Sequence, residues 1–177
     1  MVEGTDGRRV ICHSRGKKSQ GVVGDKVKWQ ASQDEGTIEK IEPRRNLFYR
    51  QDDIRTKSFA ANLDLVLVLL AAEPVFSNHQ LSRALIAAEA QGISTLIVLN
   101  KSDLVEPFAR AWERLEPYRA MGYAVQPISF RTAGADELRA LQKQLEHQTS
   151  LVLGASGAGK SKLTNKFLLG KNIQNID

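Results

Sequence analysis

The sequence contains a single cysteine, Cys12, so no disulfide can form within the chain, and it lacks the CxxC and HxxxH spacings of common metal sites. Long hydrophobic runs are also missing. The longest, residues 63–72, is interrupted by Asp64 and is about half as long as a bilayer span requires. The first ten residues, MVEGTDGRRV, lack the apolar stretch of a signal peptide. These absences predict a chain with no membrane span that works in a reducing compartment, the cytoplasm.

The positive charge of the chain is concentrated near its N-terminus. Residues 1–57 hold 13 Lys and Arg against 9 Asp and Glu, so they carry +4 of the net +5. This imbalance predicts contact with a polyanion, and RNA is the polyanion that best fits a chain without a membrane signal. The alternative is a solvated basic face. The residues expected to contact nucleic acid are Arg15, Lys17, Lys18, Arg44 and Arg45.

The pattern of hydrophobic residues changes between residues 50 and 60, which predicts a domain boundary there. Before it, the short runs RRVICH, GDKVKW and GTIEKI alternate with turn residues and predict a small antiparallel β unit. After it, apolar runs alternate with helical patterns, as in a parallel sheet. The expected strands are 63–70, 94–100, 123–129 and 149–154, each buried on both faces, and the expected helices are 77–92, 107–121, 136–147 and 160–169.

The stretch 154-GASGAGKSKL-163 matches G-x-x-x-x-G-K-[ST], a loop whose backbone N–H groups surround phosphates at a helix N-terminus. Lys160 is expected to reach the β and γ phosphates, and the Ser161 hydroxyl to bind Mg²⁺, so these two are the catalytic candidates. The alternative is a flexible Gly/Ser turn. The residues expected to contact the nucleotide here are Gly154, Ser156, Gly157, Ala158, Gly159, Lys160, Ser161 and Lys162.

A second motif, 100-NKSD-103, directly follows the predicted strand 94–100. The Asp103 carboxylate can accept the ring N–H and the amino group of guanine together, a pair of donors that adenine lacks. Asn100 is expected to hydrogen-bond the other edge of the base and its own loop, and the stem of Lys101 to pack against the ring. The alternative is an Asn/Asp turn that closes a strand. Two such motifs at the ends of parallel strands predict a guanine-nucleotide site.

A third element, 129-SFR-131, ends the next predicted strand, where similar guanine-binding proteins carry a Ser-Ala-Lys loop. Its backbone N–H groups are expected to face the guanine carbonyl. Ser129 matches that loop, whereas Phe130 and Arg131 depart from it. In this chain the base-recognition loops precede the phosphate loop. An open parallel sheet tolerates such a reordering, because the site is built from loops at the carboxyl ends of the strands.

With GDKVKW…GTIEKIEPRRNLFYR, NLDLVLVLLAAEPVFS, NKSD and TSLVLGASGAGKSKL in this order, the chain resembles the circularly permuted bacterial GTPases called ribosome small subunit-dependent GTPase A. The resemblance implies an α/β permuted P-loop GTPase domain with a partial parallel sheet, preceded by a small all-β OB-like domain. It further implies GTP hydrolysis with GTP/GDP and Mg²⁺, coupled to late maturation of the 30S ribosomal subunit through its 16S rRNA. A monomer is expected, and zinc is expected only in the family's C-terminal domain.

The sequence also departs from this family pattern. No D-x-x-G, no switch I threonine region and no Cys/His zinc motif occurs in the 177 residues. The expected domains are therefore 1–57, an OB-like RNA-binding domain with an incomplete first strand, and 58–177, a permuted GTPase domain truncated after the phosphate loop. The 177 residues are expected to hydrolyse GTP slowly. The alternative is a non-hydrolysing module that binds RNA and guanine nucleotide. An ATP-using P-loop protein is a third possibility, against which NKSD argues.

Overall fold

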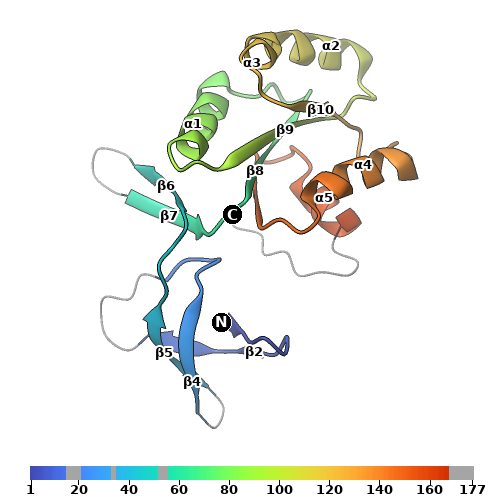
Figure 1. Ribbon diagram of the computed structural model, residues 1–177. Coiled ribbons are helices and arrows are strands. Elements are labelled where there is room, and N and C mark those ends of the chain that lie inside the picture. The colour runs from blue at the N-terminus through green and yellow to red at the C-terminus, as the bar shows by residue number, and fades with distance from the viewer. Residues whose placement is uncertain (15–20, 33–34, 52–55, 168–177) are drawn as a thin grey trace. The chain divides into compact units, whose positions relative to one another are not determined.

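The computed structural model describes residues 1–14, 21–32, 35–51 and 56–167, and the chain divides into two compact units, Met1–Asn62 and Leu63–Asp177 (Figure 1). The domain boundary predicted after residue 57 falls inside a strand that pairs with another strand of the first unit. The first unit therefore extends to Asn62. Among the residues that the structure describes, no helix combines the length and the hydrophobicity of a membrane span. The strands of the first unit are β1 (Val2–Glu3), β2 (Arg9–Val10), β3 (Cys12–Ser14), β4 (Val27–Ala31), β5 (Gly36–Ile41), β6 (Leu47–Gln51) and β7 (Thr56–Ala61).

The described residues of the first unit form three small sheets, of order β1-β2, β3-β5-β4 and β6-β7. Three of the pairings are antiparallel, as the sequence predicts, but β3 pairs with β5 in parallel. The expectation of a wholly antiparallel unit is therefore wrong. The short apolar runs predict the strands but not which strands become neighbours, because pairing depends on contacts that are distant in sequence.

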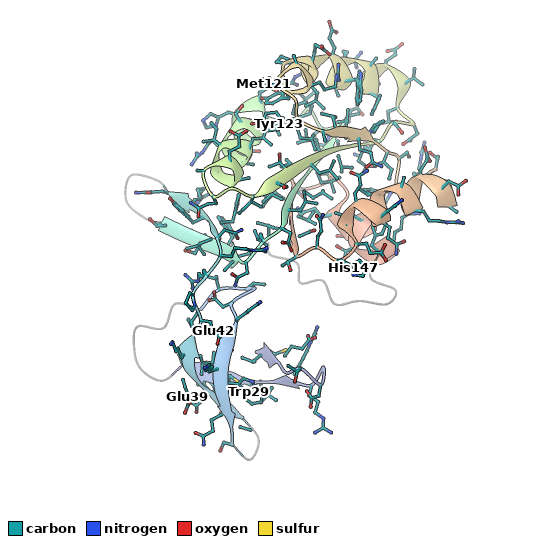
Figure 2. All side chains as sticks on the ribbon, in the orientation of Figure 1. Trp29, Glu39, Glu42, Met121, Tyr123 and His147 are labelled. Atoms are coloured by element: carbon teal, nitrogen blue, oxygen red, sulfur yellow. The ribbon has the colours of Figure 1, made fainter. Side chains whose placement is uncertain are left out.

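Gly36 begins β5 where two side chains from neighbouring strands meet over the backbone. A Cβ atom at Gly36 would lie 2.6 Å from Cys12 Sγ and 2.7 Å from Trp29 Cε3, both far closer than van der Waals contact. Figure 2 shows Trp29 on β4 in this unit. Glycine is therefore required here by the packing of the sheet.

A buried ion pair connects two turns of the first unit. The guanidinium of Arg44 donates to both carboxylate oxygens of Asp25, at 2.7 and 2.8 Å, and the Val22 N–H donates to the same carboxylate at 2.8 Å. The Asp25 side chain is only 3% exposed. Burial raises the pKa of Asp25, but the Arg44 and Val22 hydrogen bonds and the Arg44 charge together outweigh it, and the pKa lies below the ordinary 3.8.

Asp25→Asn is expected to lower the free energy of unfolding of the first unit by about 2 kcal/mol at neutral pH, since it removes the charge from a buried, hydrogen-bonded pair. Because the folded pKa is lowered, the stabilisation by Asp25 is present above 3.8 and is lost as the pH falls below that value. The variant should lose this pH dependence. Urea unfolding followed by Trp29 fluorescence in a Trp112→Phe background measures both effects. The control is Asp6→Asn, which changes an exposed pair; equal losses in the two variants would contradict the role given to Asp25.

The second unit is a parallel four-stranded sheet of order β10-β9-β8-β11, with helices on both faces (Figure 1). Its chain order alternates strands and helices, as the sequence predicts. The bounds of its elements are β8 (Leu65–Ala71), α1 (Asn78–Glu89), β9 (Ser94–Asn100), α2 (Val105–Arg114), α3 (Glu116–Ala120), β10 (Val125–Pro127), α4 (Ala135–Leu145), β11 (Ser150–Leu153) and α5 (Lys160–Phe167).

The two faces of the sheet bury alternate residues of the central strands. Leu65, Leu67 and Leu69 of β8 pack in one cluster with Leu141 of α4 and Leu163 of α5. The intervening β8 residues are also buried and point to the opposite face, where α1 packs against β8 and β9 (Figure 1). A strand that is buried on both faces has a continuous run of apolar residues in its sequence, so β8 and β9 could be predicted.

The structure corrects two details of the predicted second unit. The expected helix 107–121 is two helices, which meet at Leu115, and Pro117 lies in the first turn of the second. Proline lacks the N–H that a continuous helix would need at that position. Strands β10 and β11 are only partly buried, because in the described part of the chain they are the outer strands of the sheet.

Candidate functional site

The loops that follow β9, β10 and β11 meet at the carboxyl edge of the sheet. They enclose a pocket with a volume of about 280 Å³. In an open parallel sheet this edge is where ligands bind. The described residues that line the pocket come from all three loops: Asn100, Lys101, Asp103, Leu104, Ser129, Phe130, Arg131, Gly157, Gly159 and Lys162.

The phosphate-loop motif occupies the turn between β11 and α5. Gly157 and Gly159 have φ angles of +78° and +111°, values that residues other than glycine rarely adopt. A Cβ atom at Gly159 would lie 2.4 Å from Asn100 Nδ2, and one at Gly154 would lie 2.6 Å from the Leu69 carbonyl oxygen. The glycines therefore set both the path of this loop and its close approach to the neighbouring strands.

Lys160 and Ser161 begin α5, directly after this loop. The Lys160 ammonium donates to the carbonyl oxygens of Gly154 at 2.8 Å and Ala155 at 3.4 Å. It is thereby held across the loop, where a phosphate would meet both the ammonium and the helix N-terminus. Ser161 is exposed, so its hydroxyl is accessible to a ligand.

Asn100 joins the three loops although its side chain is almost completely buried, at 3% exposure. Its amide nitrogen donates to the Ala158 carbonyl of the phosphate loop at 2.8 Å. Its amide oxygen accepts from the Lys101 N–H at 2.8 Å and from the Phe130 N–H at 3.1 Å. One side chain thus connects the loops after β9 and β10 to the loop between β11 and α5.

The Asp103 carboxylate points into the same pocket and is held from the loop after β10. The Ser129 hydroxyl donates to Oδ1 at 2.6 Å, and the Arg131 guanidinium lies 2.6 Å from Oδ2. The Ser129 hydrogen bond lowers the pKa of Asp103, and with smaller contributions from the Asp103 N–H and Arg131 it outweighs the opposite effect of burial. The carboxylate is therefore ionised at neutral pH and can accept two donors from a ligand.

Ser129→Ala is expected to raise the pKa of Asp103, because it removes the largest cause of the lowered value. A base that pairs with the carboxylate binds only its ionised form, so affinity falls as the pH falls through this pKa. In the variant this loss should begin at a higher pH. Titrating GDP affinity from about pH 7 to about pH 3 tests the shift, with Ser94→Ala, at the exposed start of β9, as control. Identical profiles for Ser129→Ala and the native chain would contradict it.

Lys101 adopts φ +69°, and its ammonium donates to the Glu73 carbonyl oxygen at 2.5 Å. The head group is thereby anchored to the loop after β8, while Lys101 still lines the pocket. This leaves the aliphatic stem as the part available to a ring. The packing of Lys101 on a base stays a prediction.

The pocket brings together eight of the predicted nucleotide contacts, and the rest of them lie in the adjoining phosphate loop and the start of α5. The Ser129 hydroxyl donates to the Asp103 carboxylate. The Phe130 N–H, which was expected to face the base, instead donates to the Asn100 amide oxygen. Leu104 and Arg131 also line the pocket but were not predicted as site residues. Arg131 was visible in sequence only as a departure from the Ser-Ala-Lys pattern.

The predicted nucleic-acid contacts belong to the first unit. Arg15, Lys17 and Lys18 lie outside the described residues. Arg44 is engaged by Asp25, and the Arg45 guanidinium donates to the Asn62 carbonyl oxygen at 2.9 Å. A role for any of these residues in RNA binding stays a prediction.

The residues of this site suit a nucleotide with its Mg²⁺ ion. The phosphate loop offers backbone N–H groups and Lys160, and Ser161 offers a hydroxyl oxygen of the kind that Mg²⁺ binds. Across residues 1–14, 21–32, 35–51 and 56–167 there is no group of three or more His, Cys, Asp or Glu side chains that could hold a metal ion. A Mg²⁺ ion bound with the nucleotide would have the Ser161 hydroxyl available as a ligand, and proteins commonly bind this ion together with substrate phosphates and water.

Comparison with known proteins gives consistent matches over most of the chain. The model of the RsgA GTPase family matches residues 41–176. The small ribosomal subunit biogenesis GTPases RsgA of Variovorax paradoxus (strain S110) and Paraburkholderia xenovorans (strain LB400) are 64% and 49% identical over 170 residues. These 170 residues are 96% and 95% of this chain but 54% of each relative, so the chain spans about half the length of the curated relatives it matches.

Two solved structures share the fold. The crystal structure of YjeQ from Thermotoga maritima matches with a TM-score of 0.72 and 28% identity, over 96% of this chain and 60% of that one. The structure of YloQ, a circularly permuted GTPase, matches with a TM-score of 0.63 and 33% identity, over 92% of this chain and 57% of that one. In this chain the NKSD loop precedes the phosphate-loop motif, and YloQ is described as circularly permuted.

Proposed function

Because the chain belongs to the RsgA GTPase family, a family of GTPases, we propose that its second unit binds GDP and GTP in the pocket between the loops after β9, β10 and β11. In this proposal Asp103 pairs with the guanine edge, the stem of Lys101 packs on the ring, and the loop 154–161 surrounds the phosphates. The observation that carries it is the Asn100 side chain, which joins the NKSD loop to the phosphate loop through a 2.8 Å hydrogen bond. The two bonded residues, Asn100 and Ala158, are 58 positions apart in sequence, and their contact supports a single site built from both motifs.

The reaction proposed for the whole protein is GTP hydrolysis. Lys160 would neutralise charge on the β and γ phosphates, and Ser161 would hold Mg²⁺, which would stabilise the charge that develops in phosphoryl transfer. The backbone N–H groups at the start of α5 would orient the phosphates, since the positive end of a helix dipole favours anions. Calorimetric titration with GDP tests the site, with a single site per chain expected. No binding would contradict the proposal.

The process in which we place the protein is biogenesis of the small ribosomal subunit, which is what the names of its relatives state. The N-terminal unit is proposed to be an OB-like domain that contacts the rRNA. Its small sheets support this, as does the +4 charge of residues 1–57. OB folds bind oligonucleotides on one face of the barrel. A cytoplasmic monomer fits this role.

Binding of small-subunit rRNA is expected to weaken steeply as salt increases, because neutralised phosphates release counterions. Replacing Arg15, Lys17 and Lys18 with alanine should reduce both the affinity and the slope of its salt dependence, by up to about three units of slope if each residue meets a phosphate. A filter-binding series across salt concentrations measures the slope. The control is the triple variant Arg139→Ala, Lys143→Ala and Lys166→Ala in the second unit, with the same loss of charge. Equal changes in both variants would show a general charge effect and contradict the assignment.

A further inference from the structure

Both oxygens of the Asp103 carboxylate already have partners inside the pocket. The Ser129 hydroxyl donates to Oδ1, and Arg131 Nη2 lies 2.6 Å from Oδ2. Asp103 is the only carboxylate among the described residues that line the pocket. The Asp103 side chain is 12% exposed, whereas that of Arg131 is 67% exposed. The acceptor is therefore enclosed, and the cation that covers it faces solvent.

A guanine base requires the atom that Arg131 covers. Its ring N–H and amino group form a planar pair of donors attached to one carbon, the same arrangement that a guanidinium group presents. Guanine must place these donors on both oxygens of the carboxylate. Ser129 need not leave, since a carboxylate oxygen can accept more than one donor. Arg131 Nη2 lies 2.6 Å from Oδ2, so a guanine donor that takes this same position on Oδ2 displaces the guanidinium.

We propose that Arg131 is an intramolecular mimic of the guanine edge, which covers Asp103 in the nucleotide-free protein and is displaced when the base enters. This inference rests on the proposed guanine-nucleotide site and adds a regulatory residue to it. The fraction of molecules in which Arg131 has moved away limits the rate of association, and the affinity is reduced by the same fraction. An exposed arginine can make this change by side-chain rotation alone, without movement of the loops that Asn100 holds.

Removing Arg131 should leave the other properties of the carboxylate intact. Ser129, rather than Arg131, is the main cause of the lowered pKa of Asp103, so the group stays ionised at neutral pH. An ion pair with one exposed partner is weak, so its loss should increase the rate constant of association by about fivefold. Dissociation should be unchanged, since Arg131 is displaced in the bound state.

Stopped-flow binding of a fluorescent GDP to the 177-residue chain tests this, with the native protein, Arg131→Ala, Arg131→Gln and a control. The control is Arg139→Ala on α4, which removes the same charge from a side chain that is 75% exposed and outside the pocket-lining set. Faster association in both Arg131 variants, with native dissociation rates and no change in the control, supports the proposal.

The other outcomes each have a distinct meaning. Unchanged association would overturn the inference, because Arg131 would then have no effect on entry of the base. Faster dissociation with weaker affinity would also overturn it, because Arg131 would then contact the bound nucleotide. Equal acceleration in the Arg139 control would also overturn it, since net charge alone would explain the result. In each of these outcomes the native chain still binds GDP, so the proposed function stands. If the native chain binds no GDP, the proposed function fails and the inference fails with it.

Discussion

Asp103→Asn is expected to change the preferred ligand of the chain from guanosine to xanthosine nucleotides. Guanine presents two donors to the carboxylate, whereas xanthine has a carbonyl oxygen in place of the amino group. An asparagine amide offers one donor and one acceptor, which fits xanthine and leaves a mismatch against guanine. At a side chain that is only 12% exposed, the mismatch should cost about 2–4 kcal/mol, or roughly 30- to 1000-fold in affinity.

Competition binding of GDP, xanthosine diphosphate and ADP to the native and substituted chains measures this change. The matched control is Asp136→Asn on α4, where the carboxylate is 98% exposed and lies 3.9 Å from Arg139. The same amide substitution there should leave the ranking of the three nucleotides unchanged. If Asp103→Asn also leaves the ranking unchanged, Asp103 does not recognise the base and NKSD is a turn.

Gly159→Ala is expected to abolish nucleotide binding at ordinary concentrations. The new methyl group would lie 2.4 Å from Asn100 Nδ2, at a residue whose φ of +111° disfavours any side chain. Strain and overpacking together cost about 4 kcal/mol, so the loop should relax away from this conformation. Binding would have to restore it, and the affinity for GDP should fall by roughly a thousandfold.

A matched control separates the clash from the backbone strain. Gly92 also has a positive φ, +63°, but a Cβ there would meet nothing within 4 Å. Gly92→Ala should therefore reduce the stability of the chain by about 1 kcal/mol and leave GDP affinity unchanged. Thermal unfolding and GDP titration of both variants give the comparison. Native affinity in Gly159→Ala would contradict the close packing of the phosphate loop on Asn100.

The two central motifs could be predicted from sequence because each is local. Four fixed positions define the phosphate loop and three define N-K-x-D, and the strands before them are recognisable as apolar runs. The rule that parallel strands end at one edge then places both motifs in one site. The family match confirms the resemblance drawn from these stretches, and the solved structures confirm the permuted GTPase fold.

Contacts between distant residues could not be predicted in the same way. The bond from Asn100 to Ala158 and the pairing of Arg131 with Asp103 depend on how the loops approach one another, to within about an ångström. No local pattern records that approach. The parallel pairing of β3 with β5 is a similar case. The helix break at Leu115 is different, since Pro117 was a visible signal inside the expected helix.

Competition between GDP and ADP for the native chain shows whether this pocket recognises guanine through Asp103. Adenine offers no pair of donors to the carboxylate, and a site that is built to hydrogen-bond a ligand rejects analogues that lack the matching groups. GDP is expected to bind at least about a hundredfold more tightly than ADP. Equal affinity for the two nucleotides would contradict it.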